Sequence, residues 1–311
     1  MITDNHKATA GHLAALGTIL IWGTTYVSTK ILLKSFTAVE ILFSRFIIGY
    51  IALWIFYPHK MKIKSYKEEG LLMAAGLCGV TLYFLLENIA LTFTLASNTG
   101  IIISIAPLLT AVFAHFLLHG ERLKPRFMAG FIIAIAGIVL IGFNGSFLLK
   151  LNPLGDVLAA LAAVVWAAYS IIMRKISVLG FNTIACTRRI FFYGILFMVP
   201  ALFIFSFQPD FSKFANAESL LNILFLGLGA SALCFVSWNW AVGVLGAVKT
   251  SFYIYAVPVI TIVSSALILH ENITPAAYGG AFLTLAGLFI SERKIRIKKI
   301  KYHGRQCHRD T

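Results

Sequence analysis

The sequence is divided into ten apolar runs, and each is about as long as a helix that crosses a lipid bilayer. A hydrocarbon core roughly 30 Å thick requires about 20 helical residues. Backbone polar groups inside lipid must be satisfied within the chain, so only helices or closed barrels can span it. We therefore predict ten transmembrane helices, over residues 12–33, 38–57, 70–93, 97–118, 126–143, 154–173, 182–205, 219–241, 248–269 and 275–291.

The proportion of charged residues supports this interpretation. Of the 311 residues, 59% are hydrophobic and 12% are charged. Soluble domains carry about 25% charged residues, so this chain lacks the side chains that cover a water-facing globule of its size. The predicted fold class is an all-α integral membrane protein. The first apolar run is long enough to span the bilayer, so we interpret it as a helix and not as a cleavable signal peptide.

The basic residues are distributed unevenly between the two predicted sides of the membrane. Most of the 26 Lys and Arg residues lie on one side, and four loop residues, Lys30, Lys34, Lys150 and Lys213, lie on the other. Short loops rich in Lys and Arg are cytoplasmic, so we predict cytoplasmic termini and a location in the inner membrane of a prokaryote. We expect the basic tail, residues 292–311, to contact anionic lipids and not nucleic acid.

The two halves of the sequence resemble each other at a shift of about 150 residues. This similarity predicts two homologous units, over residues 12–143 and 154–291. Each unit has five predicted spans, an odd number, so the second unit would enter the membrane from the opposite side. The residue pairs that match include Trp22 and Trp166, Arg45 and Arg189, Asn88 and Asn239, Pro107 and Pro258, and Gly137 and Gly287.

An inverted repeat of this kind is typical of secondary transporters. Two similar halves of opposite orientation can exchange conformations, which opens a site at the membrane midplane to either side in turn. The alternative is a duplication that only built a stable helical bundle. We favour transport over a passive scaffold.

Several motifs occur in pairs. They are Ile21-Trp22-Gly23-Thr24-Thr25-Tyr26 with Lys30, then Arg45, Pro107, His119-Gly120-Glu121, Gly130 and Gly137, and in the second half Pro258, His270-Glu271, Gly280 and Gly287. Their order and duplication resemble the EamA family of the drug/metabolite transporter superfamily. The resemblance covers about residues 12–292, with departures at Ala167 and His270, where the first half has glycine. It implies ten helices, cytoplasmic termini, a central cavity, and export or exchange of amino acids and related metabolites.

Glu87 is the carboxylate that lies well inside a predicted span. A charge in hydrocarbon costs at least about 2.5 kcal/mol, so such a residue normally faces the bundle interior. Gly76, Gly79, Tyr83 and Glu87 are three or four residues apart and share one helix face. The glycines allow close helix packing, and Tyr83 and Glu87 would face a polar cavity. Glu87 would bind a substrate ammonium or carry a coupled proton; the alternative is a structural ion pair with Lys30 or Arg45.

Aromatic and amide side chains complete the predicted binding site. The mid-span aromatic rings would stack on a substrate or form a gate, or else only pack between helices. The two asparagines would line the cavity, or else hydrogen-bond between helices. The predicted substrate-binding residues are Trp22, Tyr26, Tyr83, Glu87, Asn88, Trp166, Tyr169 and Asn239.

Pro107 and Pro258 are predicted hinges in the middle of their spans. Proline inside a helix lacks an N–H and leaves the carbonyl four residues earlier without its partner. Those carbonyls belong to Ile103 and Ile254. In a bilayer they would need another donor, so a kink that moves or binds substrate is favoured over simple packing.

The sequence contains no HExxH, GxSxG or nucleotide-binding P-loop motif. We therefore predict no enzymatic activity, no cofactor and no metal, and transport driven by a gradient. The predicted partners are a small polar substrate, membrane lipids and a coupling proton. Within the superfamily, the alternatives are a drug carrier or a nucleotide-sugar or nucleoside carrier, with anions bound by Lys30, Arg45, Arg174 and Arg189. From other classes, the alternatives are an intramembrane enzyme or a non-transporting assembly protein.

Overall fold

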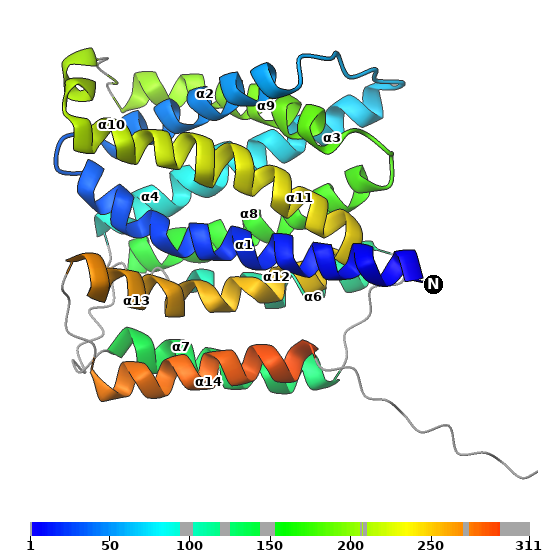
Figure 1. The fold of residues 1–311 in the computed structure, drawn as a ribbon, viewed down its shortest axis with the longest axis vertical. Helices are drawn as coiled ribbons and strands as arrows, with labels where there is room; N and C mark the ends of the chain where they lie inside the picture. The colour runs from blue at the N-terminus through cyan, green and yellow to red at the C-terminus, as the bar shows by residue number, and fades with distance from the viewer. Residues whose placement is uncertain are drawn as a thin grey trace, which may run out of the picture.

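The computed structural model describes residues 2–93, 102–118, 125–143, 153–205, 207, 210–269 and 274–292. Within these residues the chain is helical and contains no strand, and the long helices lie side by side in a single bundle (Figure 1). In chain order the α-helices are α1 (Ile2–Leu32), α2 (Ala38–Phe56), α3 (Tyr66–Gly76), α4 (Tyr83–Phe93), α6 (Ala106–Leu117), α7 (Pro125–Phe143), α8 (Pro153–Ser177), α9 (Thr183–Ile204), α10 (Ala217–Leu224), α11 (Cys234–Leu245), α12 (Ala247–Ser251), α13 (Val257–Leu269) and α14 (Pro275–Glu292).

Three of the long helical stretches change their hydrogen-bonding pattern along their length. A π-helical segment, η1 (Leu77–Leu82), joins α3 to α4, and a second, η3 (Phe225–Leu233), joins α10 to α11. A 3₁₀ segment, η4 (Phe252–Ala256), joins α12 to α13. Isolated π turns within helices are rare and often occur at functional sites.

Six helical stretches among the described residues are long and apolar enough to cross a membrane. Shorter apolar helices cover Ala106–Leu117, Phe127–Leu140 and Tyr278–Ile290. The six stretches are Ala38–Phe56, Tyr66–Ala90, Pro153–Ser177, Thr183–Ile204, Ala217–Leu245 and Ala247–Ile268.

Capping residues in the local sequence mark where α2 and α9 begin. α2 begins after Thr37, whose hydroxyl accepts from the Glu40 N–H while the Glu40 carboxylate accepts from the Thr37 N–H, a capping box. Asn182 caps α9 through its side chain. α1 begins about ten residues before the predicted apolar run, because polar residues outside lipid can continue a helix into water.

Aromatic side chains fill the centre of the bundle where α1, α2, α8 and α11 meet. Trp22 lies 5.5 Å from Trp166 and 5.1 Å from Trp238, measured between ring centroids. Phe46 and Phe235 lie 5.8 Å apart in an edge-to-face arrangement. Such pairs contribute about 0.5–1.5 kcal/mol beyond the area they bury, so this cluster fixes how the four helices pack.

At one edge of the bundle, α7 and α14 pack closely against each other (Figure 1). A Cβ atom at Gly137 would lie 2.5 Å from the Gly280 carbonyl oxygen, and one at Gly287 would lie 2.5 Å from the Gly130 carbonyl oxygen. The contact is reciprocal, because each helix places a glycine over the backbone of the other. Small residues that allow backbones to approach are the usual basis of helix packing in membranes.

Candidate functional site

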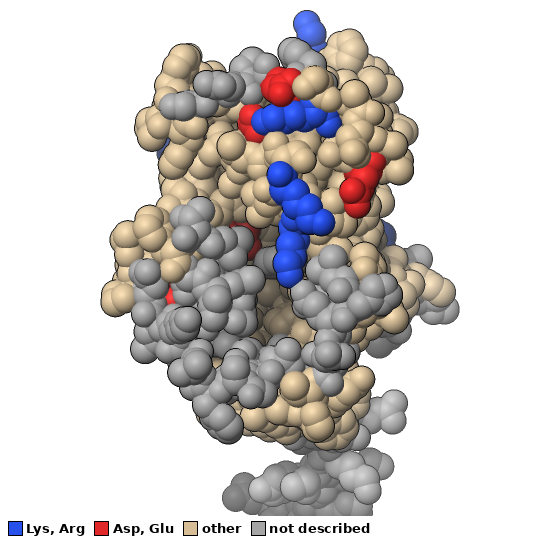
Figure 2. All heavy atoms as spheres, turned by 90° about the vertical axis from the view of Figure 1, so that its left-hand side faces the viewer, with Lys and Arg blue, Asp and Glu red and all other residues tan. Residues whose placement is uncertain are grey.

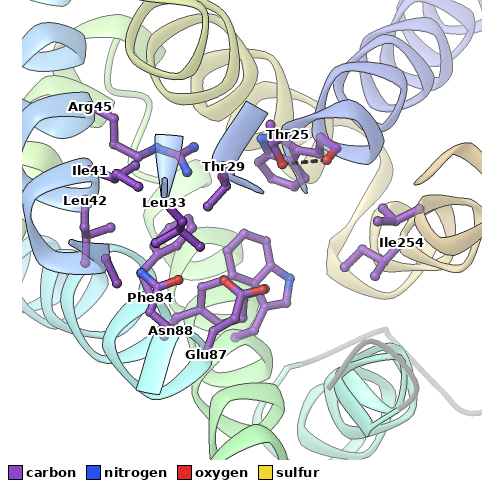
Figure 3. A pocket seen from close by; sticks show the side chains of 15 residues that line it. Thr25, Thr29, Leu33, Ile41, Leu42, Arg45, Phe84, Glu87, Asn88 and Ile254 are labelled. Atoms are coloured by element: carbon purple, nitrogen blue, oxygen red, sulfur yellow. Dashed lines mark hydrogen bonds between the residues drawn. The ribbon is translucent and has the colours of Figure 1, made fainter. Parts of the chain in front are cut away.

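A cavity of about 190 Å³ lies between α1, α2, α4, α8 and the η4–α13 segment. Leu33 and Ala38 line it near the end of α1 and the start of α2, so it extends toward that end of the bundle. Viewed from this end, the surface is hollowed near its middle and basic side chains lie beside the hollow (Figure 2). The lining residues are Trp22, Thr25, Thr29, Leu33, Ala38, Ile41, Leu42, Arg45, Tyr83, Phe84, Glu87, Asn88, Trp166, Ile254 and Val257 (Figure 3).

Two buried residues of opposite charge line this cavity. Arg45 on α2 is 6% exposed and Glu87 on α4 is 7% exposed. The Arg45 Nε–H donates to the Ser231 hydroxyl oxygen at 2.9 Å, and the Tyr83 hydroxyl donates to Glu87 Oε1 at 3.2 Å. The charges of Arg45 and Glu87 interact electrostatically across the cavity, and the alternative of a structural ion pair of Glu87 with Lys30 or Arg45 stays a prediction.

The helix that carries Glu87 is placed by its glycines. A Cβ atom at Gly76 would lie 2.6 Å from the Ile190 carbonyl oxygen, and one at Gly79 would lie 2.4 Å from the Tyr169 ring. The close packing predicted for this helix face is therefore confirmed. About one and two turns further on, Tyr83 and Glu87 both reach the cavity.

Aromatic rings form one wall of the cavity. Tyr83 lies 4.8 Å from Trp166 between ring centroids, and Trp166 lies edge-on to Trp22. The Trp22 Nε1–H donates to the Ala230 carbonyl oxygen at 3.0 Å. The Trp166 Nε1–H is buried and has no acceptor among the described residues. Of the predicted binding residues, the structure therefore brings Trp22, Tyr83, Glu87, Asn88 and Trp166 together around one cavity.

Tyr169 and Asn239, which were also predicted to bind substrate, lie outside the lining of this cavity. Both are buried, and the Tyr169 hydroxyl donates to Asn239 Oδ1 at 2.7 Å. Asn239 Nδ2 donates to the Thr187 hydroxyl at 3.1 Å. The network joins α8, α9 and α11. The side chain of Tyr26 lies outside the described residues.

Some lining residues were not predicted from the sequence. Thr25 and Thr29 follow Trp22 at spacings of three and seven, which place them on the same face of α1. That spacing could have identified them. Ser231 contacts Arg45 from η3, and no local pattern connects two residues so far apart in the chain.

The prolines lie where helices begin. Pro107 is the second residue of α6 and Pro258 is the second residue of α13. The sequence predicted both prolines in the middle of continuous spans; Pro258 does lie within the helical stretch Ala247–Ile268, whereas Pro107 follows a turn. A turn at residues 104–105 precedes α6, and η4 precedes α13, so each proline occupies a position whose N–H needs no helical partner. Ile254 in η4 lines the cavity.

Arg174 and Arg189, two of the cations considered for anion binding, contact groups outside the cavity. Arg174 Nη1 donates to the Gly243 carbonyl oxygen at 2.8 Å. Arg189 forms an ion pair with Glu69 at 2.8 Å and lies over the Tyr193 ring. Of the four cations named for an anionic substrate, Arg45 is the one that lines the cavity.

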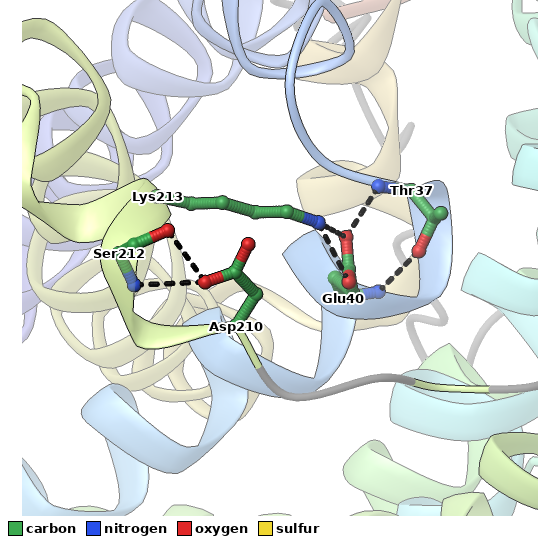
Figure 4. A network of polar contacts seen from close by, with 5 residues as sticks. All are labelled: Thr37, Glu40, Asp210, Ser212 and Lys213. Carbon is green, nitrogen blue, oxygen red and sulfur yellow. Dashed lines mark hydrogen bonds and ion pairs between the residues drawn. The ribbon is translucent and has the colours of Figure 1, made fainter.

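A second ion pair joins the opposite end of the bundle. Lys213 Nζ lies 2.9 Å from Glu40 Oε1 and 3.0 Å from Oε2, so η2 (Phe211–Ala215) is linked to the start of α2 (Figure 4). Hydrogen bonds from the Ser212 hydroxyl and backbone N–H lower the pKa of the exposed Asp210 carboxyl below its ordinary value. Asp210 therefore stays ionised beside Lys213 at neutral pH.

No cluster of three or more potential metal ligands occurs among the described residues. Membrane-length apolar helices that enclose a cavity with two buried charges define a multi-pass membrane protein with an internal polar site. Comparison with known sequences gives the family. The profile of the EamA-like transporter family matches residues 9–143 and 153–292, and the chain belongs to this family.

Relatives of similar length carry transporter names. A protein of Archaeoglobus fulgidus described as an "uncharacterized transporter" is 28% identical over 91% of this chain and 97% of its own length. A "probable terminal-alkyne amino-acid exporter" of Streptantibioticus cattleyicolor is 25% identical over 89% of this chain and 91% of its own. A "probable amino-acid metabolite efflux pump" of Escherichia coli is 24% identical over 92% and 95%.

The fold also matches a solved structure. A crystal structure covers 91% of this chain and 96% of its own chain with a TM-score of 0.75, at 21% sequence identity. At that identity the match supports the arrangement of the helices and says nothing of the substrate.

Proposed function

We propose that the protein is a secondary active transporter that exports or exchanges a small polar metabolite, an amino acid or related compound, by alternating access. The observation that carries this proposal is the cavity with Arg45 and Glu87, which are buried and come from two different helices. Charged residues at membrane depth are costly and are normally retained for function. The names of the relatives from Streptantibioticus cattleyicolor and Escherichia coli support an amino acid as substrate.

We propose further that the chain has ten spanning helices in two inverted five-helix repeats, residues 12–143 and 154–291. The family profile matches each half separately. The reciprocal glycine contacts of α7 and α14 relate equivalent positions of the two halves. With the shift that pairs Asn88 with Asn239, η1 overlaps the second part of η3. Pro107 and Pro258 each occupy the second position of a helix, which supports matching hinges.

In this proposal both termini are cytoplasmic and the protein lies in the inner membrane of a prokaryote. The Glu69–Arg189 ion pair then lies at the cytoplasmic end, and the cavity extends toward the outer end, where α1 ends. The described conformation therefore corresponds to an outward-facing state. Proton coupling through Glu87 would supply the driving force.

An anionic substrate such as a nucleotide-sugar is the main alternative. Such a substrate would require several cations in the cavity. Among the described lining residues Arg45 is the cation, and the carboxylate of Glu87 lines the same cavity. The cavity itself argues against a sealed assembly protein.

The test is transport by the purified protein in proteoliposomes. Labelled amino acids, nucleosides and organic amines are supplied under an imposed pH gradient. We expect at least one amino acid to accumulate, and we expect this accumulation to disappear when the gradient is collapsed. Absence of gradient-dependent flux for every amino acid would contradict the proposal.

A further inference from the structure

A second cavity, of about 340 Å³, lies between α2 and the segment that connects α9 to α10, and we refer to it as the α2 groove. Glu40, Ser44 and Ile48 line it from α2, at a spacing of four residues that places them on one helix face. Ile51 and Ile55 continue this face and are 49% and 65% exposed. Since α2 is long and apolar enough to cross a membrane, the face that carries the groove contacts lipid.

The α2 groove is polar at one end and apolar along the rest of its length. Its three charged lining residues, Glu40, Asp210 and Lys213, lie at the end where α2 begins (Figure 4). From Glu40 to Ile48 the helix rises roughly 12 Å. The hydrocarbon of one leaflet is about 15 Å deep, half of the bilayer core. The groove therefore extends from the level of the lipid headgroups into the hydrocarbon of a single leaflet.

Aromatic rings form the walls of the α2 groove. Phe207 packs edge-on against Phe43 at 5.5 Å between ring centroids, and Phe214 packs against Phe36 at 5.2 Å. Below the charged end, Ser44 is the polar residue among the described lining residues. A polar ligand placed there would lose its hydrogen bonds to water without replacing them. The walls therefore favour an acyl chain, which is already in contact with the outside of α2.

The charged end retains groups that can bind a ligand. Lys213 Nζ contacts both carboxylate oxygens of Glu40, at 2.9 and 3.0 Å, and a lysine ammonium has three N–H donors, so one remains. The Ser212 N–H and hydroxyl both donate to Asp210 Oδ1, at 2.9 and 2.6 Å. Asp210 Oδ2 has no hydrogen-bond donor in the described part of the chain, and it can accept from a cationic group.

The balance of charge at this end selects the headgroup. One ammonium and two carboxylates give a net negative charge, so an anionic headgroup is disfavoured. A zwitterionic phospholipid can place its phosphate at Lys213 and its cation at Asp210. A primary ammonium has N–H groups that donate to a carboxylate, whereas the quaternary ammonium of choline has none. Charge-assisted hydrogen bonds of this kind are stronger than neutral ones.

We propose that the α2 groove binds one molecule of a phospholipid with a primary ammonium headgroup, phosphatidylethanolamine. An acyl chain lies along α2, Lys213 binds the phosphate and Asp210 binds the ammonium. The lipid ties the α9–α10 connection to α2, in addition to the Glu40–Lys213 ion pair. This inference goes beyond the proposed transport function and requires only that α2 crosses the membrane. With the orientation proposed above, the lipid belongs to the outer leaflet.

The experiment compares phosphatidylethanolamine and phosphatidylcholine with the same acyl chains. Their binding to the purified full chain is measured by native mass spectrometry. Both lipids have no net charge, so the basic tail favours neither. We expect phosphatidylethanolamine to bind at least about threefold more tightly, because it alone donates N–H groups to Asp210, at a site partly open to solvent. Equal affinities, or a preference for phosphatidylcholine, would overturn the proposal.

Variants of the charged end assign the headgroup site. Asp210→Asn removes the charge and keeps an oxygen that can accept the Ser212 hydrogen bonds. We expect this variant to bind the two lipids equally. Glu218→Gln is the matched control, because Glu218 is an exposed carboxylate at the start of α10 that does not line the groove. Its preference should equal that of the unmodified chain. A full preference retained in Asp210→Asn would contradict the assignment.

A second pair of variants tests the acyl-chain site. Ser44→Trp places an indole ring in the groove, and we expect it to lower the affinity for both lipids at least about threefold, because a chain no longer fits the filled space. Ile51→Trp, on the same helix face but outside the groove, is the control and should bind both lipids normally. Equal lipid binding by the two variants would reject the groove as the site.

These measurements are independent of the proposed function, because they use no transport substrate. Selective lipid binding without flux in proteoliposomes would reject transport and keep the lipid site. Gradient-driven flux without a preference between the two lipids would reject the lipid site and keep transport.

Discussion

Glu87 is the residue at which substrate binding and energy coupling are proposed to meet. Glu87→Gln keeps the size and hydrogen-bonding capacity of the side chain but removes its charge and its titratable proton. We expect accumulation driven by a pH gradient to fall at least about tenfold, because a neutral amide can neither carry the proton nor attract an ammonium. Uptake into proteoliposomes under an imposed gradient measures this. Glu218→Gln, an exposed site at the start of α10, is the control; unchanged accumulation in Glu87→Gln would exclude proton coupling through this residue.

A substitution at Tyr169 tests whether the hydrogen-bond network of Tyr169, Asn239 and Thr187 is structural. Tyr169→Phe leaves the buried Asn239 Oδ1 without its donor, which costs about 1–3 kcal/mol. We expect a lower thermal unfolding temperature and an unchanged affinity for the transported substrate. Tyr255→Phe is the matched control, because the buried Tyr255 hydroxyl has no partner among the described residues and its loss should be neutral or stabilising.

The opposite pattern would support the original sequence prediction. A Tyr169→Phe variant of normal stability with weakened substrate binding would place Tyr169 and Asn239 in contact with substrate. The sequence could place these polar residues inside predicted spans, because hydropathy gives the limits of each span. It could not distinguish a residue that lines the cavity from one that binds a neighbouring helix, because that depends on side-chain partners 52 and 70 positions away in the chain.

At the scale of elements, the sequence predicted helices well. The run at 38–57 became Ala38–Phe56, and the run at 182–205 became Thr183–Ile204. Hydropathy and capping residues determine these ends locally. The π segments η1 and η3 were not predicted, because widening a helical turn depends on packing across helices. The turn before Pro107 and the 3₁₀ segment before Pro258 were not predicted either, for the same reason, and the hinge role of the two prolines stays a prediction.

The α7–α14 contact gives a prediction at this scale. Gly137→Leu would place side-chain atoms against the Gly280 carbonyl and the Thr284 backbone, since even a Cβ atom would lie 2.5 Å from each. Overpacking typically costs about 1–3 kcal/mol, and backbone atoms cannot move aside easily. We expect a clearly lower unfolding temperature, measured on the purified protein in detergent. Gly279→Leu is the control, because a Cβ atom there meets no other heavy atom within 4 Å; equal unfolding temperatures for the two variants would contradict the close packing.

At the scale of the whole molecule, the transport proposal depends on orientation. Loops at the Glu69–Arg189 end should face the cytoplasm, because the Lys and Arg excess lies there. Loops at the Glu40–Lys213 end should face outward. Single cysteines at exposed Lys62, beside α3, and exposed Ala215, beside α10, mark the two ends. They are introduced into a chain whose four native cysteines are replaced by serine.

Labelling with a membrane-impermeant maleimide then reports the side of each loop. Ala215→Cys should react in intact cells, and Lys62→Cys should react only after the membrane is opened. Leu179→Cys, in the loop between α8 and α9, should behave like Lys62→Cys, because the Arg189–Glu69 pair ties the start of α9 to the start of α3. Labelling of Lys62→Cys and Ala215→Cys from the same side would mean that α2 and α9 do not cross the membrane in opposite directions, as their antiparallel packing requires. The two five-helix units could then not be inverted. The cavity that extends from Arg45 toward the end of α1 would then have no outer side to open to, and the alternating-access mechanism would fail with it.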